Sequence, residues 1–196
     1  MIKIFLETGK KTTQEYVFIK TLLVTKLNKP SSDYELITVG GWNALPQVVN
    51  AFKSNTLENG ENLIVFDADF AENGGGYEVR RQALEAEITR LGIYAELFLF
   101  PNNHDDGDLE TLLETIAQKE KHTRFFDCFG DYENCLGTEY QTPNRKGKLF
   151  TYISSMKSLT MAQRHKLGQG EWCFDNDEYW DLDSEELKPL KDFLNK

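Results

Sequence analysis

One short segment constrains the fold of this chain more than any other. Residues 63–66 form a continuous apolar run, Leu-Ile-Val-Phe, and Asp67-Ala68-Asp69 follows it directly. Such a run predicts a strand that is buried on both faces, which is typical of parallel sheets covered by helices. Parallel sheets bind their ligands beyond the carboxyl ends of their strands. The segment therefore predicts an α/β fold and places acidic residues at the edge where such folds carry their sites.

Strand and helix patterns alternate four times over the first part of the chain. Apolar strand patterns cover residues 2–6, 35–39, 62–66 and 94–100. Helix patterns follow the strands at 12–27, 43–54 and 77–91, and after Asp108. At the start of the first of these helices, Thr12 and Glu15 form a Thr-x-x-Glu capping box. This order predicts a four-stranded, mostly parallel sheet with helices on both faces, the architecture also called Rossmannoid.

The alternation fades beyond residue 120. Residues 122–148 show no clear pattern, residues 148–156 fit either a strand or a helix, and the last fifteen residues predict a closing helix. We therefore predict a single domain. Its α/β core spans residues 1–120, and a C-terminal extension, residues 121–196, packs on that core.

Composition limits the partners and the compartment. Proteins that bind DNA without a partner gain most of their affinity by neutralising phosphates with positive charge. The formal net charge of −10 therefore opposes binding of nucleic acid by this chain on its own. No apolar run approaches the roughly 18 residues that span a bilayer, and no signal peptide is recognisable, so we expect a cytoplasmic protein without membrane contact. Cys128, Cys135 and Cys173 form no CxxC pair, which argues against structural zinc and favours buried, reduced thiols.

Three carboxylates are predicted to meet at the carboxyl edge of the sheet. Glu7 ends the first strand, and Asp67 and Asp69, two residues apart in extended backbone, project to the same side after the third. If the first and third strands are neighbours, these groups converge and repel one another unless a cation lies between them. Hard oxygen ligands suit Mg²⁺ or Mn²⁺.

Two motifs carry a resemblance to a known family. The stretches Ile4-Phe5-Leu6-Glu7-Thr8-Gly9 and 63–69 resemble the Toprim domain of primases, topoisomerases, recombination-repair proteins and overcoming-lysogenization-defect (OLD) nucleases. The chain is more closely similar to a bacterial family of free-standing Toprim-like proteins, through residues 97–103, 107–113, 172–175 and 187–194. The sequence departs from the family where Thr8 separates Glu7 from Gly9. It also lacks the primase zinc module and a topoisomerase tyrosine domain, so a complete topoisomerase is excluded.

The resemblance implies roles for matching positions. Glu7 would be a general acid or base and could also contact the metal, while Asp67 and Asp69 would hold Mg²⁺. Related nucleases add acidic residues after the fourth strand, and the candidates by position are Asp105, Asp106, Asp108, Glu110 and Glu114. Candidate phosphate contacts are Lys10, Lys11 and Arg80, for which solvated surface is the alternative interpretation.

Three functions remain open at this point. The first is an enzyme that carries out metal-dependent phosphoryl transfer, most simply hydrolysis of nucleic-acid phosphodiesters. The second is a non-catalytic or partner-dependent subunit that supplies a Toprim site to a nucleic-acid-processing complex, with an ATPase as the partner that grips the nucleic acid. The third is a phosphatase, or a protein that binds nucleotides or small phosphoesters. The oligomeric state and the number of metal ions are left open.

Overall fold

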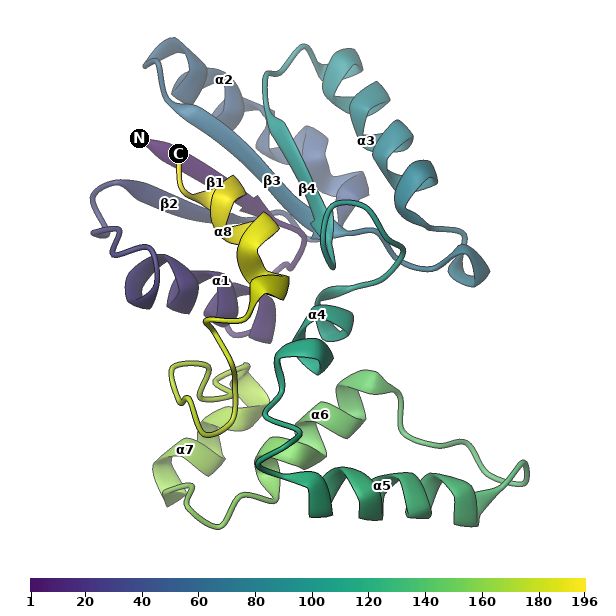
Figure 1. Cartoon of the computed structure of the whole chain (residues 1–196). Helices are drawn as coiled ribbons and strands as arrows, with labels where there is room; N and C mark the ends of the chain where they lie inside the picture. The colour runs from purple at the N-terminus through teal and green to yellow at the C-terminus, as the bar shows by residue number, and fades with distance from the viewer.

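A four-stranded, all-parallel sheet lies at the centre of the computed structural model, which describes residues 1–196 (Figure 1). The strands are β1 (Ile2–Leu6), β2 (Tyr34–Thr38), β3 (Glu61–Asp67) and β4 (Glu96–Phe100). They lie in the order β2-β1-β3-β4, and each neighbouring pair is parallel. The predicted α/β fold is confirmed, and β1 and β3 are neighbours as the convergence of the carboxylates requires.

Eight α-helices surround and extend the sheet. In chain order they are α1 (Gln14–Thr25), α2 (Val49–Leu57), α3 (Tyr77–Leu91), α4 (Leu109–Ile116), α5 (Thr123–Leu136), α6 (Arg145–Ser154), α7 (Met161–Lys166) and α8 (Lys188–Leu194). Short 3₁₀ segments lie at Trp42–Val48, Ala71–Asn73, Leu167–Gln169 and Glu185–Leu187. No helix combines the length and the apolar composition needed to cross a membrane.

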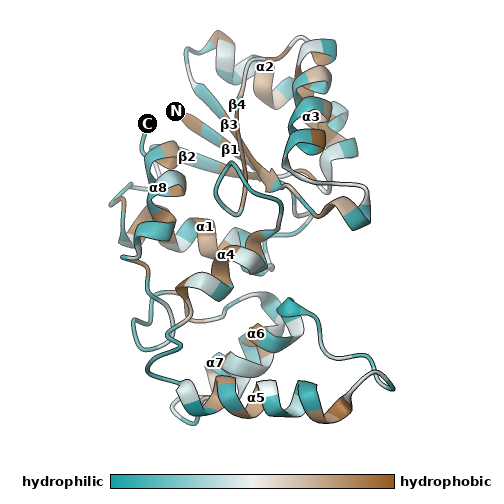
Figure 2. Cartoon of the chain, turned by 45° about the vertical axis from the view of Figure 1, so that its right-hand side comes forward, coloured by the Kyte–Doolittle hydropathy of each residue, from teal (hydrophilic) through white to brown (hydrophobic).

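Successive strand residues face opposite layers, because side chains alternate across a sheet. In β3, Leu63 and Val65 join a larger core with α1, α4 and α8, whereas Ile64 and Phe66 join a smaller core with α2 and α3. Figure 2 shows the hydrophobic residues along the strands and on the sides of the helices that face them. Helices therefore cover both faces, as the apolar run at 63–66 predicts.

The C-terminal part of the chain shares the larger core. Trp172 and Trp180 are buried, and the Trp180 indole N–H donates to the carbonyl oxygen of Trp172 at 2.8 Å. The hydroxyl of Tyr152 in α6 donates to the carbonyl oxygen of Tyr179 at 3.0 Å. The chain then returns to the sheet, so that α8 and the C-terminus lie near the N-terminal end of the chain (Figure 1). Leu194 of α8 is fully buried in the larger core. Residues of the extension thus supply part of the layer that covers β1 and β3.

Several local expectations are wrong. The helix predicted at 43–54 is a 3₁₀ segment that contains Pro46, followed by α2, because proline cannot supply the backbone N–H of a continuous α-helix. Helix α1 is capped by Thr13, whose hydroxyl accepts from the Tyr16 N–H, and not by Thr12. The segment 122–148, for which no element was predicted, contains α5 and the start of α6. Of the two alternatives left for 148–156, the structure has the helix, which ends at Ser154.

The buried-thiol prediction is also wrong for two of the three cysteines. Cys128 and Cys135 are exposed on α5, and only Cys173 is partly buried. Helix α5 buries a single residue, Phe129, so most of its side chains face solvent.

Candidate functional site

Glu7 and Asp67 meet because their strands are hydrogen-bonded neighbours. Register pairs Leu6 of β1 with Val65 of β3, so both strands end at the same edge of the sheet. One carboxylate oxygen of Glu7, Oε2, accepts from the backbone N–H of Asp67 at 3.0 Å. The first two members of the predicted constellation therefore lie side by side.

A cavity of about 280 Å³ opens beside these two residues. Four of its lining side chains are carboxylic acids, Glu7, Glu15, Asp67 and Glu110, and one is a cation, Lys146. The remaining lining residues are Thr8, Thr13, Gln14 and Leu109. We call this cavity the carboxyl pocket; it gathers acids from β1, α1, β3 and α4.

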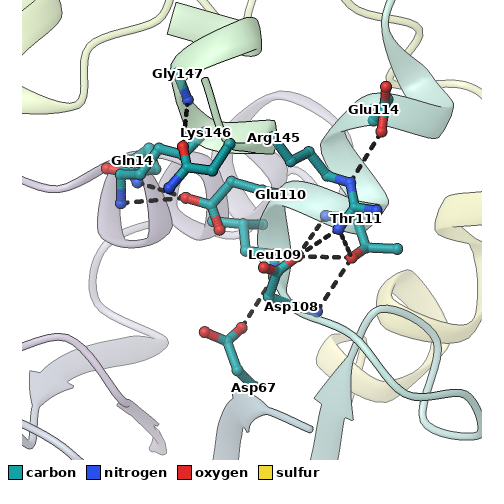
Figure 3. Close-up of polar contacts among 11 residues, drawn as sticks. Gln14, Asp67, Asp108, Leu109, Glu110, Thr111, Glu114, Arg145, Lys146 and Gly147 are labelled. Carbon is teal, nitrogen blue, oxygen red and sulfur yellow. Dashed lines mark hydrogen bonds and ion pairs between the residues drawn. The ribbon is translucent and has the colours of Figure 1, made fainter. Parts of the chain in front are cut away.

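The starts of three helices build the walls of the carboxyl pocket (Figure 3). At the start of α4, the Leu109 N–H donates to Oδ1 of Asp67 at 2.9 Å. The next residue, Glu110, accepts from the side-chain amide of Gln14 in α1 at 2.8 Å and pairs with Lys146 of α6 at 3.1 Å. Each acid is thus held by neighbouring elements that are distant in sequence.

Glu15 holds the loop that carries Glu7. Its two carboxylate oxygens accept from the backbone N–H groups of Glu7 and Thr8, at 2.9 Å and 3.0 Å. This bidentate contact fixes the turn between β1 and α1, where the sequence departs from the Toprim pattern. Glu15 therefore positions Glu7 and also adds a fourth acid to the pocket.

Burial and mutual repulsion raise the pKa values of these acids. Burial, followed by the repulsion from Glu7, raises the pKa of Glu15 to about 8. Burial is also the main cause that raises the pKa of Asp67 well above its ordinary value, with Glu15, Glu7 and Glu110 adding repulsion. The pKa of Glu7 is raised in the same direction, again mainly by burial, although the Asp67 N–H partly offsets it. The pocket therefore has an excess of negative charge when its acids ionise.

The oxygens of the pocket are only partly used by the protein. The contacts of Glu7, Asp67 and Glu110 within hydrogen-bond distance engage one oxygen of each, namely Oε2, Oδ1 and Oε1. The second oxygens of Asp67 and Glu110 have no such contact, whereas the backbone N–H of Trp42 also acts on the Glu7 carboxylate. The side chains are not, however, arranged as a ready coordination shell, since no group of three Asp, Glu, His or Cys residues is placed to hold a metal ion.

Asp69 does not line the carboxyl pocket. Its φ of 61° is left-handed, so the extended backbone on which the shared direction of Asp67 and Asp69 was predicted ends at residue 67. The Asp69 carboxylate pairs instead with Arg80 of α3. Arg80 lies over the ring of Trp42, with 5.3 Å from its guanidinium carbon to the ring centroid, and its side chain is only 11% exposed. The pair thus lies outside the carboxyl pocket, although the charges of Asp69 and Arg80 both act on Glu7.

The predicted auxiliary acids divide into one inside the pocket and four outside it. Glu110 lines the pocket. Asp108 caps α4, where its carboxylate accepts from the Thr111 N–H at 2.7 Å, and Glu114 pairs with Arg145 at 2.9 Å. The other two lie in the loop after β4. Asp106 accepts from the Tyr77 N–H at 2.7 Å, and the exposed Asp105 contacts Asn102 and His104.

The predicted lysine contacts are not in the pocket, and two pocket residues were not predicted. Lys10 and Lys11 are exposed, and Lys11 lines a separate groove between α1 and α7. The sequence pattern assigned Glu15 to a helix cap. The only sequence feature that could have placed it in the pocket is its position eight residues after Glu7, beyond a turn rich in threonine. Lys146 is not among the predicted phosphate contacts, because residues 122–148 gave no pattern that placed it near residue 110.

No protein-family model, curated protein or solved structure matches this chain. The resemblance to Toprim proteins therefore stays a prediction made from the motifs that end β1 and β3.

Proposed function

We propose that the carboxyl pocket binds a divalent cation, Mg²⁺ or Mn²⁺, and that the protein uses it for phosphoryl-transfer chemistry. The observation that carries the proposal is the meeting of Glu7, Asp67 and Glu110 in one cavity, where Asp67 and Glu110 each keep a second carboxylate oxygen that accepts no hydrogen bond from the protein. An acidic cavity with one half-exposed lysine lacks the positive charge that its acids require. A small divalent cation supplies that charge and prefers oxygen ligands.

The donor set fits such an ion in its chemistry. All four acids offer hard oxygen atoms, and the pocket holds no cysteine or histidine that would favour zinc or copper. The side chains of Glu7, Asp67 and Glu110 must rotate to bring three oxygens to one point. Because the hydrogen bonds to Glu7 and Asp67 come from backbone N–H groups, their first oxygens stay anchored while the second oxygens turn.

Each residue has a separate part in the proposed reaction. Asp67 and Glu110 hold the cation, which when bound polarises a phosphoryl oxygen. Glu7, whose pKa is raised by burial and which lies at the pocket wall, accepts or donates the proton in the reaction. Glu15 keeps the Glu7 loop in position through its two backbone contacts.

The substrate class follows from charge and resemblance. The Toprim-like motifs support a nucleic-acid phosphodiester, whereas the net charge of −10 opposes binding of nucleic acid by this chain alone. A nucleic-acid substrate is compatible with this net charge when a basic partner, such as an ATPase of a nucleic-acid-processing complex, holds the nucleic-acid strand. The cavity of about 280 Å³ also suits a small phosphoester, which is the second candidate substrate.

Calorimetric titration of Mn²⁺ and Mg²⁺ tests the metal site directly. Asp67→Asn is the informative variant, because its side-chain amide oxygen can still accept the hydrogen bond from the Leu109 N–H. The second carboxylate oxygen is replaced by an uncharged NH₂ group, which cannot bind a cation. Asp106→Asn is the matched control, since it makes the same chemical change outside the pocket. We expect binding by the wild type and by Asp106→Asn, and loss of binding by a folded Asp67→Asn variant.

Two results would oppose the proposal. Equal binding by Asp67→Asn would place any metal elsewhere, and no binding by the wild type at several millimolar cation would remove the metal site from the isolated chain. If binding is confirmed, hydrolysis of single-stranded and duplex oligonucleotides and of a small aryl phosphate then separates the two substrate classes.

A further inference from the structure

Three cations at the start of α6 face the acids of α4. Arg145, Lys146 and Lys148 follow the cap residue Asn144, so they lie where the positive end of the helix dipole disfavours positive side chains. The carboxylates of Glu110 and Glu114 offset this cost. Figure 3 shows Arg145 and Lys146 of α6 reaching Glu114 and Glu110 of α4.

The three cations do not have equal roles. Arg145 contacts Glu114 at 2.9 Å and also donates to the Thr111 hydroxyl at 2.9 Å, and Lys148 contacts Glu114 at 3.0 Å. Glu114 lies outside the carboxyl pocket, so these two residues attach α6 to α4 without entering it. Their side chains are 34% and 22% exposed.

Lys146 is the cation that enters the pocket. Its ammonium group lies 3.1 Å from Oε1 of Glu110, and it has no other ion-pair partner. Its side chain is 56% exposed, whereas that of Glu110 is 11% exposed. A lysine that is anchored only at its tip and surrounded by water can turn away while Arg145 and Lys148 keep α6 in place.

We propose that Lys146 is a built-in competitor of the divalent cation for Glu110, and that it sets the affinity of the carboxyl pocket for metal. This inference rests on the metal site proposed above. When no metal is bound, Lys146 offsets the charge of one of the four acids that line the carboxyl pocket. A divalent cation placed between Asp67 and Glu110 repels the ammonium group, so Lys146 turns outward as the metal enters, while α6 remains docked.

Two variants that remove the same charge from the same helix test this competition. In Lys146→Met the competitor is lost, and we expect the Kd for Mn²⁺ to fall by about fivefold, the factor that corresponds to the upper range for a partly exposed ion pair. Lys148→Met removes an equal charge that contacts only Glu114, and we expect a change of less than about twofold. Lys146→Arg keeps a cation opposite Glu110 and should bind Mn²⁺ as the wild type does.

A second measurement follows Lys146 itself. The rate at which an amine-reactive ester acylates Lys146, followed by peptide mass spectrometry, should rise when Mg²⁺ saturates the protein, whereas the rate at Lys148 should not. This measurement reports the position of the lysine without any substrate turnover.

The outcomes separate the two proposals. Unchanged or weaker Mn²⁺ binding by Lys146→Met, with binding by the wild type, would overturn the competition and leave the metal site standing. Absence of binding in the wild type and in Lys146→Met would overturn both. Binding that is tight only in Lys146→Met would support the competition in its strongest form.

Discussion

Raising the pH in the absence of divalent cations should destabilise this protein, and Glu15 provides the magnitude. Burial and the charge of Glu7 raise the pKa of Glu15 from 4.5 to about 8. Because the pKa is higher in the folded state, the folded protein keeps a proton that the unfolded chain releases. The corresponding stability is complete below pH 4.5 and is lost as the pH rises through 8. The free energy of unfolding therefore falls by about 1.4 kcal/mol for each pH unit in that window, or about 5 kcal/mol in total.

The pocket acids account for most of the expected change in the free energy of unfolding in this pH range. Asp67 and Glu7 also have raised pKa values, so they add to the loss with the same sign. Carboxylates whose pKa is lowered, such as Glu114 and Asp105, change charge below their ordinary values and contribute at more acidic pH. The expected curve therefore declines from about pH 4.5 to about pH 8.

Urea unfolding at a series of pH values, with a chelator present, measures this decline. Glu7→Gln removes the largest repulsion on Glu15 and should make the slope shallower, whereas Asp106→Asn, outside the pocket, should leave it unchanged. Saturating Mg²⁺ should stabilise the protein most at the alkaline end, where the acids are ionised. A free energy of unfolding that stays constant or rises between about pH 4.5 and pH 8 would refute the reasoning.

Three substitutions test how the rest of the structure supports the pocket. Gly170→Ala should cost about 2–4 kcal/mol by thermal or urea unfolding, because Gly170 has a φ of +77° and an added Cβ would lie 2.1 Å from the carbonyl carbon of Thr13; a variant as stable as the wild type would contradict this contact. Arg145→Ala removes its contacts with Glu114 and Thr111 and should cost about 1 kcal/mol, with the loss reduced at high salt. Trp180→Ala opens a cavity in the larger core and should cost about 3–5 kcal/mol, measured by urea unfolding.

The fold was predictable where local signals and burial agree. Helix α3 spans the predicted residues 77–91, because Gly76 precedes it and Gly92, with a φ of +59°, ends it in a left-handed turn. Helix α5 was missed although Phe125, Phe126 and Phe129 lie on one side of it, and the first two pack against the larger core. Only Phe129 of this helix is buried, so burial there gives a weaker signal than in the helices that cover the sheet.

The candidate site was predictable only for residues attached to strands. Adjacent parallel strands bring Glu7 and Asp67 together once the strand order is assumed, and the structure has that order. Asp69 follows a backbone turn that no two-residue spacing predicts, since its direction depends on a left-handed φ and on Arg80. Lys146 reaches the pocket through the packing of α6 on α4, 36 residues after Glu110, and a single sequence carries no signal for such a distant contact.

The return of α8 to the sheet has a consequence for the synthesis of the chain. Leu190 and Leu194 belong to the larger core, which covers one face of the sheet, and Phe193 packs against Phe98 of β4. The strands of that sheet are synthesised before α8. A nascent chain that has emerged only through α4 therefore exposes an apolar sheet face while the remaining residues are translated. Such a face attracts chaperones or aggregates, so the yield of folded protein should depend on completing the final helix more than on any single residue of the pocket.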